Sequence, residues 1–231
     1  MTKDFAYYTG DVCMTIEKLR DVFFFQALED DALQLFLNHG TIRAYPRHTV
    51  VINEGDDSCS LYIVLDGKLK VYLSDESGRE IILGLEGPGG YIGEVSLLDS
   101  EPRSASVMTL EKTRCLVISK DNFHECLRNY PDVAIGVIGG LTHRIRSLLG
   151  NVRNLGLKNV YRRLVSVLLD MSQPHGEVSV LTEKLTHQDI ADMIGASREM
   201  VSRILRDLIT GGYISVENKS ITIHRTPPAG W

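Results

Sequence analysis

The 231-residue chain has few of the features that metal-binding, secreted and membrane proteins need. Its four cysteines (Cys13, Cys59, Cys115 and Cys126) form no CxxC pair, and none of its seven histidines belongs to an HExxH motif, so we expect no metal site. Its apolar runs fall far below the roughly 18 residues of a membrane span, and the first residues lack a basic patch followed by an apolar segment. We therefore predict a soluble, cytoplasmic protein with no membrane contact.

The chain also lacks the sequence motifs of common enzyme classes. It contains no nucleophile elbow, no paired-metal motif and no Walker loop, and GPGG at residues 87–90 precedes a strand-like run, which is typical of a turn. We therefore predict that the protein is not an enzyme. The net charge of −5 comes entirely from residues 1–159, because residues 160–231 carry eight basic and eight acidic residues. A neutral C-terminal part can still present a local basic surface to DNA.

The spacing of apolar residues changes along the chain. Residues 15–38 carry apolar side chains at intervals of three and four, which predicts a helix. From about residue 40 to 119, short runs rich in β-branched residues alternate with turn signals such as EGDD, DESG and EPRS, which predicts an antiparallel sandwich or barrel. Gly67 and Gly78 stand where such turns favour a positive φ.

After Pro131 the spacing becomes that of a coiled coil. Apolar residues follow one another at intervals of 3, 4, 3, 4 and 3, with a β-branched residue at every a position and Leu at every d position. That combination favours a parallel two-stranded coiled coil and thus a homodimer; the alternative is a helix packed on its own domain. Gly139 and Gly140 weaken this helix, which predicts a bend or a close backbone approach there. The predicted interface residues are Ile138, Leu141, Ile145, Leu148, Val152 and Leu155.

The segment THQDIADMIGASREMVSRILRDLITGGYI has the spacing of a helix-turn-helix motif. Thr186 is a predicted N-cap, Gly195 ends the first helix and Ser197 caps the second. Before this motif, VYRRLVSVLLDMSQ predicts a helix and QPHGE a turn; after it, YISVENKSITIHR predicts two strands joined near residues 218–219, as in a wing. The side chains of the second helix that we expect to face inward are Val201, Ile204, Leu205 and Leu208.

Polar residues at the start of the second helix form the predicted DNA-reading face. An Arg guanidinium can donate two hydrogen bonds to guanine O6 and N7, and a carboxylate can accept one from cytosine N4. Arg and Glu side chains at a helix start can therefore read consecutive base pairs in a major groove. The alternative is a solvated face with an i,i+4 ion pair between Glu199 and Arg203. The predicted DNA-binding residues are Ser197, Arg198, Glu199, Ser202 and Arg203.

From about residue 22 to 225 the chain resembles the Crp–Fnr family of bacterial transcription regulators. SREMVSR, at residues 197–203, matches the start of the family's recognition helix, and GEVSLLDSEPRSAS, at residues 93–106, is similar to a cyclic-nucleotide phosphate-binding cassette. The resemblance implies palindromic DNA sites with TGTGA-like half-sites, and RNA polymerase as a further partner. The implied α+β fold has an antiparallel, jelly-roll-like β-roll that binds cyclic nucleotides (1–130), a long dimerisation helix and hinge (131–158), and a winged helix-turn-helix domain (159–231).

The resemblance also implies roles for the cassette residues. Glu94 would accept a hydrogen bond from a ribose 2′-hydroxyl, and Arg103 would bind a cyclic phosphate, whose single negative charge and two free oxygens suit a guanidinium fork. The implied ligand is cAMP. Leu148 and Leu149 replace the Thr-Ser pair that contacts the adenine in the bacterial activator, so we expect poor discrimination against cGMP. The implied ligand-binding residues are Gly93, Glu94, Val95, Arg103, Ser104, Arg144, Leu148, Leu149 and Asn151.

Three alternatives stay open. A regulator of the same fold can use a cyclic dinucleotide as effector, or can bind DNA without any ligand. A cyclic-nucleotide-binding regulatory subunit without DNA binding would fit the cassette but leaves SREMVSR unexplained. The iron–sulfur sensors of the same family need a cluster of N-terminal cysteines, which Cys13 alone does not provide.

Overall fold

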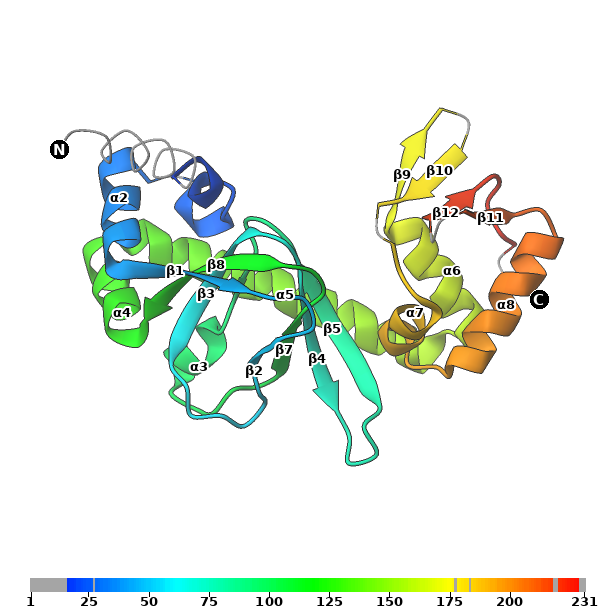
Figure 1. Ribbon diagram of the computed structural model, residues 1–231, viewed down its shortest axis with the longest axis horizontal. Helices are drawn as coiled ribbons and strands as arrows, with labels where there is room; N and C mark the ends of the chain where they lie inside the picture. Colours follow the sequence, from blue (N-terminus) through cyan, green and yellow to red (C-terminus); the bar gives the residue numbers. More distant parts are fainter. Residues whose placement is uncertain (1–15, 27, 177, 183, 218–219, 229–231) are drawn as a thin grey trace. The chain divides into compact units, whose positions relative to one another are not determined.

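The computed structural model describes residues 16–26, 28–176, 178–182, 184–217 and 220–228 (Figure 1). These residues form two compact units. The first contains the described residues up to Leu73 together with Leu83–Arg146, and the second contains Ser74–Ile82 together with the described residues from Ser147 onward. The predicted fold class is confirmed, because antiparallel sheets precede one long helix and a helix-turn-helix motif follows it.

Two four-stranded sheets form the β-roll. Their strand orders are β1-β8-β3-β6 and β2-β7-β4-β5. The pairs β1–β8, β8–β3, β3–β6, β2–β7 and β7–β4 run antiparallel. The turn glycines Gly67 and Gly78 have positive φ, as predicted. The strands are β1 (Gly40–Tyr45), β2 (Val50–Ile52), β3 (Ser60–Asp66), β4 (Leu69–Ser74), β5 (Glu80–Glu86), β6 (Tyr91–Ile92), β7 (Ser106–Thr109) and β8 (Thr113–Ser119).

Strand β3 is buried on both faces and connects the two parts of the core. Leu61, Ile63 and Leu65 belong to the apolar cluster that includes residues of the surrounding helices. Tyr62 and Val64 alternate with them and belong to a second cluster, to which both sheets contribute. Because successive side chains of a strand point to opposite faces, the uninterrupted apolar run LYIVL fills both layers at once.

The prediction of one continuous helix over residues 15–38 is wrong in its middle. Helical structure ends at Arg20, a short 3₁₀ turn η1 follows (Phe23–Phe25), and α2 (Asp30–His39) begins after it. Phe24 and Phe25 are both buried in the main core. In a straight helix these adjacent rings would point about 100° apart, and the break lets both enter the same core.

The long helix α5 (Pro131–Leu157) is one uninterrupted element. The close approach predicted at the glycine pair is present: a side chain on Gly140 would collide with the hydroxyl of Tyr91. A Cβ on Gly136, one turn earlier, would lie 2.6 Å from Cβ of Phe24. The first half of α5 therefore packs against β6 and η1 at distances that only glycine permits. The remaining helices of this part are α3 (Glu94–Asp99) and α4 (Lys120–Asn129).

In its described residues, the second unit combines the end of α5 and the helices α6, α7 and α8 with one antiparallel sheet of order β11-β12-β10-β9. QPHGE was predicted as a turn, but Gln173, Pro174 and His175 belong to a strand paired with β10, and the turn begins only at Gly176, which has a φ of 67°. Asn218 and Lys219, the predicted wing turn, lie outside the described residues. The elements are α6 (Val160–Asp170), β9 (Ser172–His175), β10 (Val178–Leu181), α7 (His187–Ile194), α8 (Arg198–Thr210), β11 (Ile214–Glu217) and β12 (Ser220–Ile223).

Candidate functional site

The short helix α3 begins at a glycine that no other residue could replace without strain. Gly93 has a φ of 92°, a left-handed conformation, and a Cβ at this position would lie 2.5 Å from Arg103 Nη1 and 2.5 Å from the carbonyl oxygen of Ser60. The missing side chain lets the Arg103 guanidinium lie directly against the backbone. Glu94 follows as the first residue of α3, so the glycine places both charged groups of the cassette.

The guanidinium of Arg103 is buried, and no acidic side chain among the described residues pairs with it. Only 3% of the residue is exposed, and its four hydrogen bonds go to neutral oxygens. Burial lowers its pKa from the ordinary value, which reflects the cost of a buried charge held by neutral groups. These acceptors are Ser58 Oγ (3.0 Å), Ser60 O (2.7 Å), Gly93 O (2.9 Å) and Ser96 Oγ (2.9 Å).

Glu94 is buried as well, and it pairs with a different guanidinium. Its Oε1 accepts a hydrogen bond from Arg144 Nη1, on α5. Its Oε2 is buried and has no hydrogen-bond partner among the residues that the structure describes, which is unusual for a carboxylate that is only 1% exposed. Arg144 Nη2 also donates to Glu86 Oε1 at 3.0 Å and to the carbonyl oxygen of Tyr91 at 3.1 Å. Burial alone would lower the pKa of Arg144, but Glu94 and Glu86 together hold it above its usual value.

Glu94, Arg103 and Arg144 line one small cavity within the first unit, and Glu86 lies behind Arg144, outside the lining residues. Six of the nine predicted ligand-binding residues line it: Gly93, Glu94, Val95, Arg103, Ser104 and Arg144. Apolar side chains of Ile52, Val71, Ile92 and Val107 complete its wall. The cavity thus combines an apolar surface with one uncompensated guanidinium and one unpartnered carboxylate oxygen.

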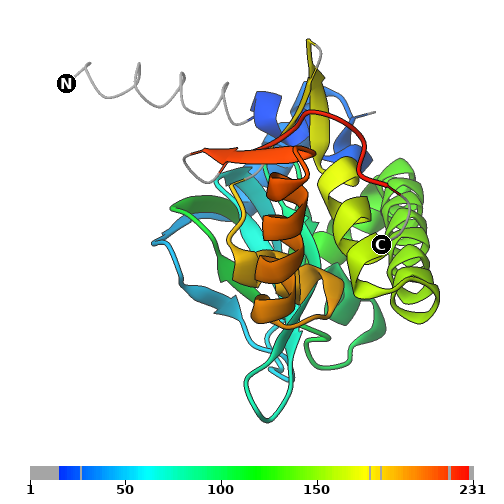
Figure 2. The ribbon, with the colours of Figure 1, turned by 90° about the vertical axis from the view of Figure 1, so that its right-hand side faces the viewer.

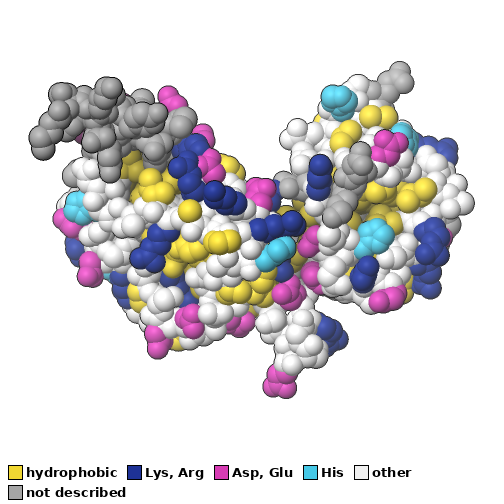
Figure 3. Space-filling model, in the orientation of Figure 1, with side chains coloured by type: hydrophobic (Ala, Val, Ile, Leu, Met, Phe, Trp, Pro, Cys, Tyr) yellow, Lys and Arg dark blue, Asp and Glu magenta, His cyan; other side chains and the backbone are white. Residues whose placement is uncertain are grey.

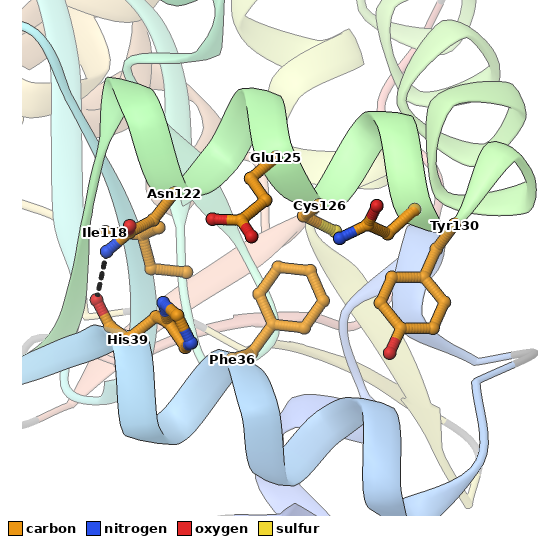
Figure 4. A pocket seen from close by; sticks show the side chains of 8 residues that line it. Phe36, His39, Ile118, Asn122, Glu125, Cys126 and Tyr130 are labelled. Carbon is orange, nitrogen blue, oxygen red and sulfur yellow. Dashed lines mark hydrogen bonds between the residues drawn. The ribbon is translucent and has the colours of Figure 1, made fainter.

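A larger surface pocket, of about 460 Å³, lies between α2 and α4 and contains none of the predicted site residues (Figure 4). Phe36, Ile118, Cys126 and Tyr130 form its apolar part, and the side-chain amide of Asn122 donates to the carbonyl oxygen of His39 across it. Burial raises the pKa of the Cys126 thiol to about 12, so this sulfur is protonated at neutral pH and is a poor nucleophile.

The helix-turn-helix motif forms as predicted in the second unit. Thr186 and Asp189 make a reciprocal capping box at the start of α7, and Gly195 ends that helix with a φ of 60°. Ser197 caps α8 by accepting a hydrogen bond from the backbone N–H of Met200 at 3.3 Å. As expected, the side chains buried beneath α8 are Val201, Ile204, Leu205 and Leu208.

The predicted DNA-reading residues fall into two groups, charged side chains that are exposed and serines that already form hydrogen bonds within the protein. Arg198, Glu199 and Arg203 are exposed, and among the described residues Glu199 forms no ion pair with Arg203. Ser197 and Ser202 are already engaged, the first in the cap and the second in a 2.8 Å hydrogen bond with His187 Nδ1. Figure 2 shows α8 facing the viewer, and Lys and Arg side chains gather over this helix in Figure 3. The exposed face can therefore meet an external polyanion without first breaking an internal ion pair.

The sequence and its structure were compared with known protein families. Residues 42–130 match the family described as cyclic nucleotide-binding domain, and residues 162–227 match the family described as Crp-like helix-turn-helix domain. A "CRP-like cAMP-activated global transcriptional regulator" of Mycobacterium tuberculosis (strain ATCC 25618 / H37Rv) is 30% identical, with 86% of this chain and 91% of the relative covered. The chain belongs to the Crp–Fnr family of transcription regulators.

Other members of the Crp–Fnr family agree with this assignment. The "cAMP-activated global transcriptional regulator CRP" of Salmonella typhimurium is 32% identical over 85% of this chain and 96% of its own length. The structure of the c-di-GMP responsive regulator CLP of Xanthomonas campestris superimposes with a TM-score of 0.77 at 25% identity, covering 86% of this chain and all of that chain. The protein is thus a Crp-like regulator with a cyclic nucleotide-binding domain and a DNA-binding helix-turn-helix domain, and its family consists of regulators, not enzymes.

Apolar side chains are exposed along α5, as the predicted dimer interface requires. The exposed residues differ in part from the predicted a and d positions. Ile138, Ile145 and Val152, the predicted a positions, are 62%, 58% and 66% exposed. Leu141, a predicted d position, instead packs against the core of the β-roll, which corrects its assignment. The side chain of Leu155 lies outside the described residues. Leu148, another predicted d position, is 38% exposed, so the exposed row combines the a positions and Leu148 with Ile135 and Leu149.

The structure does not bring every predicted ligand-binding residue to the cavity. Leu148, Leu149 and Asn151 are exposed and are not among its lining residues. Sequence reasoning in turn missed Ser58 and Glu86. Ser58 follows the turn signal EGDD at a distance in sequence from the cassette, and Glu86 ends a strand whose pattern indicates only β-structure. Ser58 contacts Arg103 and Glu86 contacts Arg144 only because the folded chain brings distant segments together, and no local sequence signal marks either residue.

Among the described residues, no helix is long and apolar enough to cross a membrane. The same residues contain no group of three or more His, Cys, Asp or Glu side chains placed to hold a metal ion.

Proposed function

We propose that the protein is a cyclic-nucleotide-responsive homodimer that binds a palindromic, TGTGA-like DNA site when cAMP, or alternatively cGMP, occupies the cavity of the β-roll. One observation carries this proposal. Within the described part of the chain, the cavity holds a buried guanidinium without an acidic partner, Arg103, and a buried carboxylate oxygen without a donor, Glu94 Oε2. A ligand with one anionic group and one hydroxyl supplies what each of them lacks.

In this proposal Arg103 and Glu94 bind the two ends of one ligand. The phosphate would take the place of neutral acceptors around the Arg103 guanidinium, and its negative charge would offset the buried positive charge. The ribose 2′-hydroxyl would donate to Glu94 Oε2, while Arg144 keeps Oε1. Val95, Ser104 and the apolar wall would surround the sugar and phosphate.

We expect weak discrimination between adenine and guanine. Leu148 and Leu149 have no polar atoms with which to distinguish the two bases, and Asn151 and Arg144 offer hydrogen bonds that either base can accept. Titration calorimetry with cAMP and cGMP tests this. A preference for cAMP above about 100-fold, near 2.7 kcal/mol, would contradict it.

A second candidate effector is a cyclic dinucleotide. The support is the likeness to CLP, which is named as c-di-GMP responsive and shares 25% identity and a TM-score of 0.77 with this chain. Against it stands the pairing of one buried guanidinium, Arg103, with one carboxylate, Glu94, in the same cavity, which suits a ligand with a single phosphate and a single ribose. Titration with c-di-GMP beside cAMP distinguishes them: saturable binding of c-di-GMP alone would replace cAMP as the proposed effector.

Dimerisation and DNA binding form the second half of the proposal. The exposed apolar row of α5 would pair with the same helix of a second copy; its residues are Ile135, Ile138, Ile145, Leu148, Leu149 and Val152. Two copies of α8 could then enter successive major grooves about 34 Å apart. Arg198, Glu199 and Arg203 would read the base edges, and RNA polymerase would be the partner in regulation, as proposed from the family resemblance.

A mobility shift on a TGTGA-N6-TCACA duplex, with no ligand, cAMP, cGMP or c-di-GMP, tests the whole proposal. We expect a shift that depends on the ligand and disappears when both half-sites are scrambled. Because coupling between two sites is reciprocal, the duplex must raise nucleotide affinity by the same factor by which the nucleotide raises DNA affinity. Equal binding to both duplexes in all conditions would overturn the proposed site.

A further inference from the structure

Glu86, the last residue of β5, does not line the ligand cavity but is joined to it through Arg144, and it has no role in the proposed ligand contacts. Its Oε1 accepts a hydrogen bond from Arg144 Nη2 at 3.0 Å, while Nη1 of the same guanidinium holds Glu94. One guanidinium thus serves two carboxylates. The fold also makes room for this side chain, because a Cβ on Gly90 would lie 2.6 Å from Glu86 Oε2. Glu86 is therefore fixed in place at the site.

The charges of the site cancel before any ligand enters. Glu86 and Glu94 carry the negative charges, and Arg103 and Arg144 carry the positive ones. Arg144 is engaged by both carboxylates, whereas Arg103 contacts neutral oxygens. An anionic ligand consequently leaves the site with one excess negative charge. Glu86 is the carboxylate responsible for this excess, since Glu94 is needed for the ligand hydroxyl.

We propose that Glu86 is a positioning residue that holds Arg144 to the β-roll and, while it is charged, weakens the binding of an anionic ligand in the cavity. The inference rests on the proposed function. Its geometric basis is the shared guanidinium: Arg144 Nη2 joins α5 to Glu86 on β5 and to the backbone of Tyr91 on β6. These two hydrogen bonds do not involve Glu94, so they can persist when Glu94 accepts a hydrogen bond from a ligand.

The same arrangement makes ligand binding dependent on pH. The ionisable groups that face Glu86 are Tyr91 on β6, Glu94 on α3 and Arg144 on α5. Burial raises the pKa of Glu86; Arg144 opposes that effect and Glu94 adds to it. A bound anion favours the neutral carboxyl form, so binding takes up protons. Affinity should therefore fall as the pH rises through the titration of Glu86.

The test is calorimetric titration of full-length wild type, Glu86→Gln and the control Glu111→Gln with cAMP across a pH series. Glu111 is an exposed residue of the β7–β8 turn, and its substitution makes the same change in net charge. We expect Glu86→Gln to bind cAMP about five- to tenfold more tightly, which is the size of effect expected when one charge roughly 12–17 Å from the anion is removed at an effective dielectric constant near 20. Its affinity should no longer fall with rising pH, and Glu111→Gln should match the wild type.

Two further measurements separate this role from a merely structural one. The gain of Glu86→Gln should be equal for cAMP and 2′-deoxy-cAMP, because the hydroxyl is assigned to Glu94, and it should shrink at high salt. Glu86→Asp keeps the charge and should keep the pH dependence. This variant and the proton uptake of the wild type remain decisive if Glu86→Gln does not fold.

The outcomes distinguish the two proposals. If the wild type binds cAMP or cGMP but Glu86→Gln binds no more tightly, or if the wild type takes up no protons on binding, the role of Glu86 is wrong and the proposed function stands. If the wild type binds neither nucleotide, both are overturned.

Discussion

The ligand cavity and the start of α8 use the same side-chain types in opposite ways. In the cavity, Arg103 is 3% exposed and held by four hydrogen bonds, and Glu94 is buried against Arg144. On α8, Arg198 and Glu199 are exposed, and neither forms an ion pair within the described residues. A small anion has few groups with which to organise its receptor, so the protein must hold the charges in place beforehand. A DNA groove supplies a dense array of partners, so exposed side chains suffice.

The largest effect expected from this comparison is at Arg103. Arg103→Ala should weaken nucleotide binding by at least about 100-fold, since two charge-assisted hydrogen bonds to the phosphate contribute roughly 1.5–3 kcal/mol each. Nucleotide-dependent DNA binding should vanish with it. Calorimetry and mobility shifts measure both effects, and circular dichroism checks the fold. Arg103→Lys keeps the positive charge but not the two-pronged guanidinium, so it should recover only part of the nucleotide affinity. Unchanged nucleotide affinity in Arg103→Ala would show that Arg103 does not bind the ligand.

The exposed row of α5 differs from both regions, because its side chains are exposed like those of α8 but are apolar. Ile145→Glu places a charge in the proposed interface and should convert the dimer to a monomer that no longer binds the palindrome. Light scattering after size-exclusion chromatography gives the mass. Ser147→Glu, which adds the same exposed charge about 200° around the helix, is the control and should remain dimeric. A monomeric wild type, or an unchanged dimer in Ile145→Glu, would reject the row as the interface.

On α8, Glu199→Ala should leave nucleotide binding intact and relax specificity at one base pair of each half-site. A good side-chain contact to a base discriminates by about 1–3 kcal/mol, so the preference at that position should fall by roughly five- to 150-fold. Mobility shifts on duplexes substituted one base pair at a time measure this. An unchanged preference at every position would show that Glu199 does not read a base.

The smallest effect is expected at the capping box that begins α7. Thr186→Ala removes the hydroxyl that accepts from the Asp189 N–H and should lower the free energy of unfolding by about 1 kcal/mol. Chemical denaturation followed by circular dichroism measures it. Thr210→Ala, whose hydroxyl contacts only the carbonyl oxygen of Arg206 in its own helix, should change stability by less than about 0.5 kcal/mol. A similar loss in both variants would argue against the cap.

Local patterns in the sequence predicted the fold well wherever a short segment carries its own signal. The capping residues Thr186 and Ser197, the turn glycine Gly195 and the inward face of α8 were all predicted, because caps and helix periodicity depend on near neighbours. Predictions were wrong where distant contacts override the local pattern. The 3₁₀ turn at Phe23–Phe25 follows the core rather than the helix periodicity, and β9 exists only because β10 pairs with it.

The candidate site shows the same division. The cassette spacing placed Gly93, Glu94 and Arg103 in one cavity, since a loop and one short helix span all three. Arg144 came from the resemblance, and the structure adds that it pairs with Glu94 from 50 residues away. Nothing in the sequence marked Ser58 or Glu86, whose neighbours are assembled from other strands and turns.

The sequence by itself determined the order of β-roll, long helix and helix-turn-helix motif, and it supplied the residues of the proposed cassette and of the proposed DNA-reading face. Each of these depends on spacing within a few turns of chain. Only the tertiary structure decided which groups these residues meet. It buried Arg103 among neutral oxygens, joined Glu86 and Glu94 through Arg144, and turned Leu141 toward its own core. The physical reason is that the energy of a buried charge or an apolar face depends on what surrounds it in space, and distant segments of the chain supply those surroundings.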